Sequence, residues 1–125
     1  MSAQLETRTK TFALDAVCFC ADLPRVPEVG HIRSQLQRCS TSVAANYRAA
    51  CRGKSKADFI AKLGTVEEEA DESVFWLEFL RELDARRNLG INGPLGKELD
   101  RLADEARQLL AITIISRKTA RESSR

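Results

Sequence analysis

Hydrophobic residues recur every three or four positions along nearly the whole chain, which is the spacing of amphipathic helices. Pro24 and Pro27 interrupt the first such stretch, and glycines end the next two. These signals predict four helices, at about residues 4–23, 28–51, 55–89 and 94–118. The connections between them are short, so consecutive helices should pack antiparallel. The pattern therefore predicts an all-α protein with one domain over residues 1–125, an up-down antiparallel four-helix bundle.

The third predicted helix has the clearest beginning and the longest apolar stripe. Ser55 can cap its first turn, and Asp58 replaces the usual Glu of a capping box. The stripe repeats at about 3.5 residues, the period of helical bundles; its members are Phe59, Leu63, Val66, Ala70, Val74, Leu77 and Leu80. A second apolar row widens the later half of the helix: Phe75, Trp76, Phe79 and Leu83. This row either packs on another helix of the same chain or forms an oligomer interface.

The remaining segments indicate a water-soluble protein. The last ten residues, SRKTARESSR from Ser116 to Arg125, are polar, and we expect this tail to fray. The longest apolar-rich run, Leu109 to Ile115, is far shorter than the roughly 20 residues of a membrane span. With 43% hydrophobic and 30% charged residues, the composition is that of a folded domain and not of a disordered chain. We therefore expect a cytoplasmic protein that has no membrane partner.

Charge is distributed unevenly along the chain, although the formal net charge is only +2. Between residues 33 and 62, one acid, Asp58, stands among the basic residues Arg33, Arg38, Arg48, Arg52, Lys54, Lys56 and Lys62. Between residues 67 and 84, one base, Arg81, stands among the acids Glu67, Glu68, Glu69, Asp71, Glu72, Glu78, Glu82 and Asp84. The chain is thus basic around the second predicted turn and acidic along the third predicted helix.

The basic residues around this turn are candidates for binding phosphate. Arg52, Lys54 and Lys56 surround the turn, so they should gather at one end of the bundle, where the N-terminus of the third helix adds partial positive charge. The alternative is a solvated end whose cations pair with acids on a neighbouring helix or subunit. The candidate nucleic-acid-binding residues are Arg48, Arg52, Lys54, Lys56, Lys62 and Arg38.

The sequence contains no recognisable arrangement of catalytic or metal-binding residues. The one histidine, His31, rules out a di-iron bundle site, which needs a histidine on each of two helices. Neither a nucleophile paired with a base nor a glycine-rich phosphate loop is present. The cysteines are Cys18, Cys20, Cys39 and Cys51, without a CxxC pair, and we expect them to be reduced and mainly structural. We expect no enzyme activity, no cofactor and no metal.

The stretch from Arg38 to Phe59 follows a known motif. The pattern R-x-x-x-S-I-x-x-N-I-A-E-G, a basic pair and then S-x-x-E-F is matched at Arg38, Ser42, Val43, Asn46, Lys54, Ser55, Asp58 and Phe59. Glu72 falls where a glutamate is frequent in the third helix. Over about residues 32–83 the chain therefore resembles the four-helix-bundle family encoded in intervening sequences of bacterial 23S ribosomal RNA genes. A related branch is the accessory variability protein of diversity-generating retroelements.

The resemblance implies an up-down bundle that assembles as a ring-like homopentamer, with the second apolar row in the subunit interface. In the retroelement relatives the assembly binds nucleic acid and a reverse transcriptase, whereas no activity is settled for the intervening-sequence branch. Ser42 and Asn46 are expected to satisfy backbone groups or each other. The chain departs from the motif at Tyr47 and at Arg48-Ala49-Ala50, which replace I and A-E-G.

Two functions remain in view from the sequence. The first is a non-enzymatic, homo-oligomeric bundle that binds the backbone of RNA or DNA through its basic helix–turn end. The alternative is a protein-interaction scaffold without affinity for nucleic acid, which would use the acidic third helix or the tail from Ser116 to Arg125.

Overall fold

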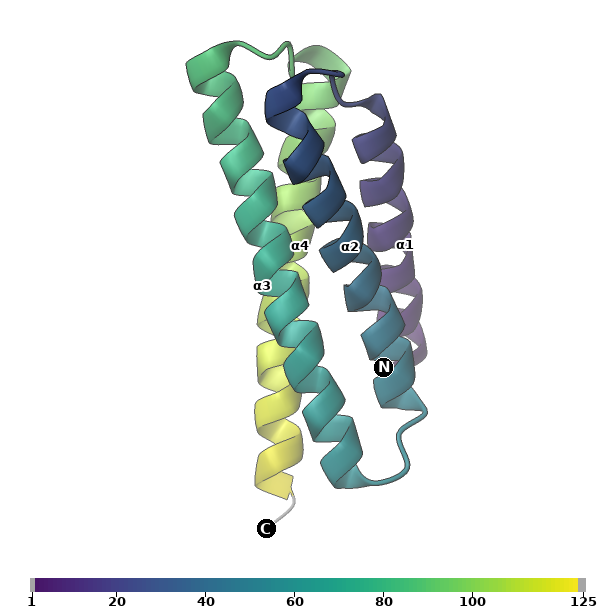
Figure 1. Ribbon diagram of the computed structural model, residues 1–125. Coiled ribbons are helices and arrows are strands. Elements are labelled where there is room, and N and C mark those ends of the chain that lie inside the picture. The colour runs from purple at the N-terminus through teal and green to yellow at the C-terminus, as the bar shows by residue number, and fades with distance from the viewer. Residues whose placement is uncertain (1, 124–125) are drawn as a thin grey trace.

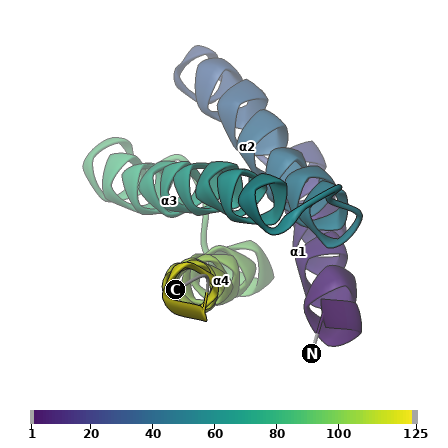
Figure 2. The same ribbon diagram turned by 90° about the horizontal axis from the view of Figure 1, so that it is seen from below.

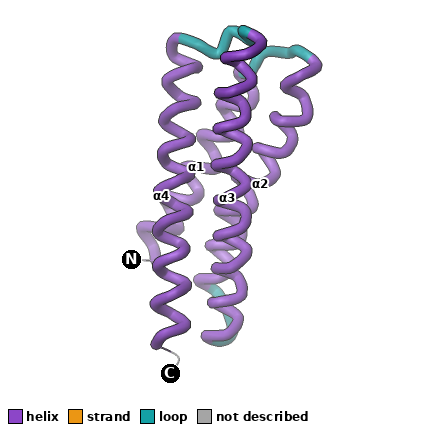
Figure 3. The backbone as a smooth tube through the Cα atoms, turned by 90° about the vertical axis from the view of Figure 1, so that its left-hand side faces the viewer, coloured by secondary structure: helices purple, strands orange, loops and turns teal. Residues whose placement is uncertain are grey.

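The computed structural model describes residues 2–123 and forms four helices in that range. They are α1 (Ser2–Asp22), α2 (Pro27–Cys51), α3 (Lys56–Arg87) and α4 (Gly93–Ser123). Successive helices run in opposite directions, so that the α2–α3 turn and the end of α4 lie together at the lower end (Figure 1). Residues 2–123 consist of helices and the loops that connect them (Figure 3). The predicted all-α, up-down four-helix bundle is therefore confirmed.

The helix α3 lies between α2 and α4 and packs on both (Figure 2). The predicted apolar face of the third helix is the reason for this packing, because its residues Leu63, Leu77 and Leu80 are fully buried. The helix α1 packs mainly on α2 and makes a smaller contact with α4. With 21 residues against 32 in α3, α1 is also the shorter helix, so the lower ends of α3 and α4 extend past it (Figure 1).

The buried side chains form two clusters along the bundle. The upper cluster joins all four helices and includes Phe12, Phe19, Leu36, Leu77 and Leu102. The lower cluster lies between α2 and α3 and consists of Val43, Tyr47, Ala50, Leu63, Val66 and Ala70. Two of these six residues, Ala50 and Ala70, are small, and Tyr47 is the one aromatic side chain among the six.

The helix α3 ends at Arg87, two residues before the predicted end at residue 89. Asn88, and not Gly90, terminates it by adopting the left-handed conformation, with φ of 51°. Its backbone N–H donates to the carbonyl of Asp84 at 2.8 Å. Gly90 also has positive φ but lies within the following loop. Asparagine tolerates this conformation better than other non-glycine residues, which explains the earlier stop.

The prediction that the tail from Ser116 to Arg125 frays was wrong for residues 116–123, because α4 continues to Ser123, beyond the predicted helix end at residue 118. Contacts with α3 hold this last part of the helix, among them the ion pair between Arg117 Nη1 and Glu67 Oε1 at 3.7 Å. Arg117 lies across Gly64, where a Cβ atom would come within 3.0 Å of its guanidinium. Lys56 Nζ donates to Ser123 Oγ at 2.9 Å. The final two residues of the expected tail, 124–125, lie outside the described residues.

Asp84 organises the loop between α3 and α4. Its Oδ1 accepts hydrogen bonds from the backbone N–H of Leu89 at 2.9 Å and of Ile91 at 3.2 Å. Ile91 is itself buried in the upper cluster, so the carboxylate fixes the loop that delivers this side chain to the core. Since Asp84 is largely shielded, with 16% of its side chain exposed, water replaces these bonds poorly.

We predict that Asp84→Ala lowers the free energy of unfolding by about 1–3 kcal/mol, because two shielded N–H groups lose their acceptor. Urea denaturation followed by circular dichroism measures this change. The matched control is Asp104→Ala, since Asp104 accepts one bond from an exposed side chain, Gln108; it should change stability by less than about 0.5 kcal/mol. Equal effects of the two substitutions would contradict the role given to Asp84.

Candidate nucleic-acid interface at the lower end of the bundle

Exposed cations from three segments meet at the lower end of the bundle. The C-terminal part of α2, the α2–α3 turn and the C-terminal part of α4 all end there (Figure 1). We call this surface the basic end; its residues are Arg48, Arg52, Lys54, Lys56, Lys118 and Arg121, all exposed. The local charge is therefore positive from more than one helix, as a polyanion-binding surface requires.

The sequence interpretation missed Lys118 and Arg121. They are more than 60 positions from the α2–α3 turn, and both were placed at or beyond the predicted end of the fourth helix. The structure brings them beside the turn because α4 is nearly as long as α3 and the Lys56–Ser123 hydrogen bond joins the two ends. The continued helical spacing of Leu109, Thr113 and Ala120 was the signal that could have indicated them.

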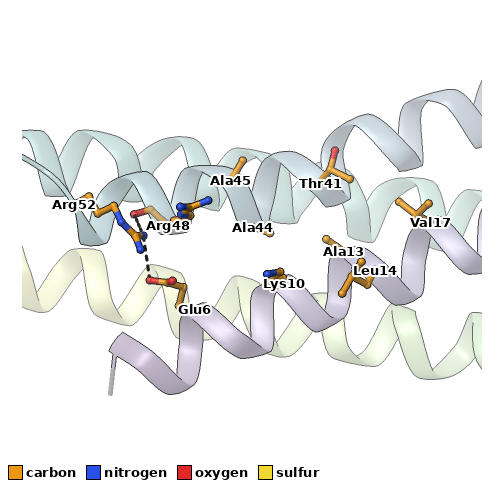
Figure 4. Close-up of a pocket in the computed structure, with 10 residues that line it drawn as sticks. All are labelled: Glu6, Lys10, Ala13, Leu14, Val17, Thr41, Ala44, Ala45, Arg48 and Arg52. Atoms are coloured by element: carbon orange, nitrogen blue, oxygen red, sulfur yellow. Dashed lines mark hydrogen bonds and ion pairs between the residues drawn. The ribbon is translucent and has the colours of Figure 1, made fainter.

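Within residues 2–123, most cations of the basic end form no salt bridge. Arg52 is the exception, with Nη1 3.5 Å from Glu6 Oε1 of α1 (Figure 4). In the same range, salt bridges to the other five members are absent. Some of this charge also offsets the partial negative charge of two helix C-termini, those of α2 and α4.

Asp58 occupies the N-terminus of α3 and removes it from the candidate site. Its backbone N–H donates to Ser55 Oγ at 3.1 Å, which confirms the predicted cap. Its carboxylate accepts from Lys62 Nζ at 2.6 Å and from the Lys54 backbone N–H at 3.2 Å. The lysine and this N–H hold the pKa of Asp58 below its ordinary value. Lys62 is therefore engaged, and positive charge at the basic end comes from side chains and not from the helix terminus.

Arg38, the other peripheral candidate, does not reach the basic end. It lies halfway along α2 and bridges to α3, where Nη1 donates to Glu69 Oε2 at 2.8 Å and Nη2 donates to Glu72. The indole N–H of Trp76 donates to Glu72 at 3.1 Å. Arg38, more than Trp76, lowers the pKa of Glu72. Arg38 is thus a structural bridge between two helices.

Arg33 has a structural role as well. Its guanidinium donates to the carbonyls of Cys20, Leu23 and Pro24, at 3.0, 3.1 and 2.9 Å. These carbonyls belong to the end of α1 and the following turn, where no further helical turn can satisfy them. The predicted basic tract therefore contains one residue that caps a helix.

The four residues of the second apolar row of α3 lie in two different environments. Trp76 and Leu83 are half-buried against the upper cluster, and Trp76 contacts His31 edge to face with ring centroids 5.6 Å apart. Phe75 and Phe79 point outward, with 51% and 42% of their surfaces exposed. One half of the row thus packs within the chain, and the other half is left open for a contact outside it.

A groove of about 530 Å³ runs between α1 and α2 (Figure 4). Arg52, Arg48 and Lys10 lie along one half of it, with Glu6 among them. The other half is apolar and small, lined mainly by Ala13, Leu14, Val17 and Ala44. Leu14 is 58% exposed there, which is unusual for a leucine on a packed helix.

The described residues show little that could perform redox or metal chemistry. All four cysteines are free, and burial raises the pKa of Cys20 to about 12. Across residues 2–123, no three acidic, cysteine or histidine side chains are grouped as metal ligands. No helix in this range is both long and apolar enough to cross a membrane.

We predict that the Arg38–Glu72 bridge makes the protein acid-sensitive. The lowered pKa of Glu72 means that its stabilising effect is full above the ordinary value of 4.5 and is lost as the pH falls through the lowered pKa. Arg38→Gln should lower the free energy of unfolding at pH 7 by about 1 kcal/mol or less, since Arg38 is half-exposed. It should also reduce the further loss of stability between pH 7 and pH 3.

Denaturant titrations at both pH values measure the two effects. The control Arg107→Gln removes an arginine from the other side of α3, where Arg107 pairs with Glu78 at 3.0 Å, and leaves Glu72 untouched. It should retain the wild-type acid sensitivity. If Arg38→Gln were as sensitive to acid as the wild type, the bridge would not set the pH dependence.

Comparison with known proteins agrees with this architecture. Residues 3–111 match the 23S rRNA-intervening sequence protein family. The fold is similar to the crystal structure of a protein of unknown function from the S23 ribosomal protein family of Bacteroides thetaiotaomicron VPI-5482. The TM-score is 0.76 at 24% identity, over 91% of this chain and 98% of that chain. No curated protein sequence matches significantly. Because the family match extends over most of its length, the chain belongs to the 23S rRNA-intervening sequence protein family.

Proposed function

We propose that this protein is a non-enzymatic, self-assembling helical bundle that binds the phosphate backbone of RNA or DNA through the basic end. The observation that carries the proposal is the meeting of six exposed cations from α2, the α2–α3 turn and α4. Binding of such a surface to phosphates releases condensed counterions, which supplies affinity without sequence specificity.

The side chains near these cations indicate how a nucleic acid would bind. Tyr47 is buried and Phe59 is half-buried against the lower cluster, so neither offers an open face on which a base could stack. Long lysine and arginine side chains on a helix end contact phosphates but do not read base edges. The basic end should therefore prefer the shape or charge density of a nucleic acid over its sequence.

Self-assembly as a homopentamer is part of the proposal. Phe75 and Phe79 form an exposed aromatic pair with ring centroids 5.8 Å apart, a feature typical of surfaces that meet another protein. A ring of parallel copies would place several basic ends around one axis. The number of phosphates bound at once would then rise with the number of subunits.

The same aromatic pair supports a second candidate, a protein-interaction scaffold without affinity for nucleic acid. Exposed phenylalanines flanked by acids suit a protein partner that carries apolar and basic side chains. In this case the charges of the basic end would serve solubility and the compensation of helix C-termini. Binding measurements on the basic end separate the two candidates.

We predict that Arg52→Glu/Lys54→Glu weakens binding to a structured RNA and to a matched DNA duplex by at least about tenfold at low salt. The slope of log affinity against log salt should become shallower by roughly 0.9 for each phosphate that the variant no longer neutralises. Fluorescence anisotropy at several salt concentrations measures both quantities.

The matched control is Arg25→Glu/Lys97→Glu, which makes the same change in net charge at the opposite end of the bundle. Arg25 lies in the α1–α2 turn and Lys97 near the start of α4, and both are exposed. This control should keep most of the wild-type affinity. Equal losses of affinity in the two variants would mean that net charge alone attracts nucleic acid, and no binding by the wild type would favour the scaffold.

A further inference from the structure

A row of exposed acids and aromatics follows the outer face of α3. We call it the α3 stripe; its residues are Glu68, Asp71, Phe75, Phe79 and Glu82, all exposed. Their spacing of three or four positions places them on one face of the helix. Glu68, Asp71 and Glu82 take part in no salt bridge among the described residues. The stripe is therefore a surface whose charges and apolar groups are available to a second molecule.

The groove between α1 and α2 has the complementary chemistry. Its apolar half offers small side chains beside the exposed Leu14 (Figure 4). Small side chains leave room for an aromatic anchor from a second molecule. Its basic half carries Lys10 and Arg48, which lie on facing helices and form no salt bridge within residues 2–123. Aromatic anchors in an apolar pocket with charges at its rim are the usual composition of a protein interface.

The two surfaces also agree in the order of their groups. At 1.5 Å per residue, the groove extends for about 16 Å along residues 6–17 of α1, and the stripe for about 21 Å along residues 68–82. If the phenylalanines enter the apolar half, the acids at 68 and 71 fall at Lys10 and Arg48. Opposite charges and apolar groups are then paired along residues 68–79 of the stripe, and the longer stripe continues past the apolar half of the groove to Glu82.

This alignment fixes the direction of the second molecule. The stripe runs from acids to phenylalanines along α3, and the groove runs from apolar to basic along α2. The partner's α3 therefore lies antiparallel to α2, as α3 does within the chain itself. Neighbouring copies then stand side by side in the same direction. Since groove and stripe are different surfaces, the contact is heterologous and repeats around an axis until the ring closes.

We propose that the α1–α2 groove is the docking site for the α3 stripe of a second copy of this chain. The inference rests on the self-assembly included in the proposed function and assigns the surfaces that meet. It places Arg48 in the subunit contact. Arg52 also lines the groove, whereas Lys54, Lys56, Lys118 and Arg121 lie outside it, and every basic end of the ring points to the same side.

Charge reversal on both surfaces tests the assignment. The groove variant is Lys10→Glu/Arg48→Glu, the stripe variant is Glu68→Lys/Asp71→Lys, and a third variant carries all four substitutions. Each double substitution should weaken assembly by about tenfold or more, because like charges then meet in the contact. The fourfold variant should regain the wild-type mass, since each of its contacts pairs reversed charges. Sedimentation equilibrium over a range of protein concentrations measures the mass.

Circular dichroism and thermal denaturation confirm that each variant is folded, which is expected because all four residues are exposed. Arg25→Glu/Lys97→Glu is the control and should assemble as the wild type does. Failure of the fourfold variant to assemble, or wild-type assembly by either double variant, would overturn the pairing of groove and stripe. A monomeric wild type would overturn self-assembly as well, whereas nucleic-acid binding by the basic end would still be measurable on that monomer.

Discussion

The bundle depends on α3, because this helix presents the buried apolar face on which both α2 and α4 pack. Leu63, Leu77 and Leu80 have no exposed surface, and the two neighbouring helices cover opposite sides of α3 (Figure 2). Ion pairs border this contact on each side, with Arg38 on α2 and Arg107 on α4. The acidic character of the third helix is thus partly explained by the fold, since its carboxylates join α3 to the helices beside it. Only the acids on the outward face are left for other contacts.

The fold was predictable to the extent that it depends on local signals. Prolines marked the first turn, and Ser55 marked the beginning of α3 at the position where its hydroxyl caps the helix. One end that was missed, that of α4, is set by contacts between residues far apart in the sequence. Arg117 lies over Gly64, some fifty positions away, and this packing keeps the last turns of α4 helical although their composition is polar. Asn88 ended α3 before Gly90 because Asp84 stabilises the loop that follows.

The candidate site was only partly predictable, because charge counted along a chain does not show which charges remain available. Arg33, Arg38 and Lys62 are engaged within the fold, by helix carbonyls, by α3 acids and by Asp58. The count also ignored Lys118 and Arg121, which reach the same end from a different helix. Each of these outcomes follows from helix length and register, which decide what lies beside a given side chain. Neither the helix lengths nor the register between helices can be read from the charges of a short stretch of sequence.

The residues that identify the family are mostly engaged inside the chain. Arg38 and Glu72 pair across α2 and α3, and Asn46 donates to the carbonyl and the hydroxyl of Ser42 at 2.9 Å each. The Arg38–Glu72 pair joins α2 to α3, whereas the Ser42–Asn46 pair lies within α2, so family membership carries the architecture more than a function. The departure from A-E-G is different, because it lies beside the basic end. Arg48 replaces an alanine of the motif, and Ala49 replaces its glutamate, so this chain is more positive there than the motif by two charges. The helix is not harmed, since the glycine position is a buried alanine and α2 continues to Cys51. The departure from the motif therefore adds positive charge beside an already positive surface without a structural need for it.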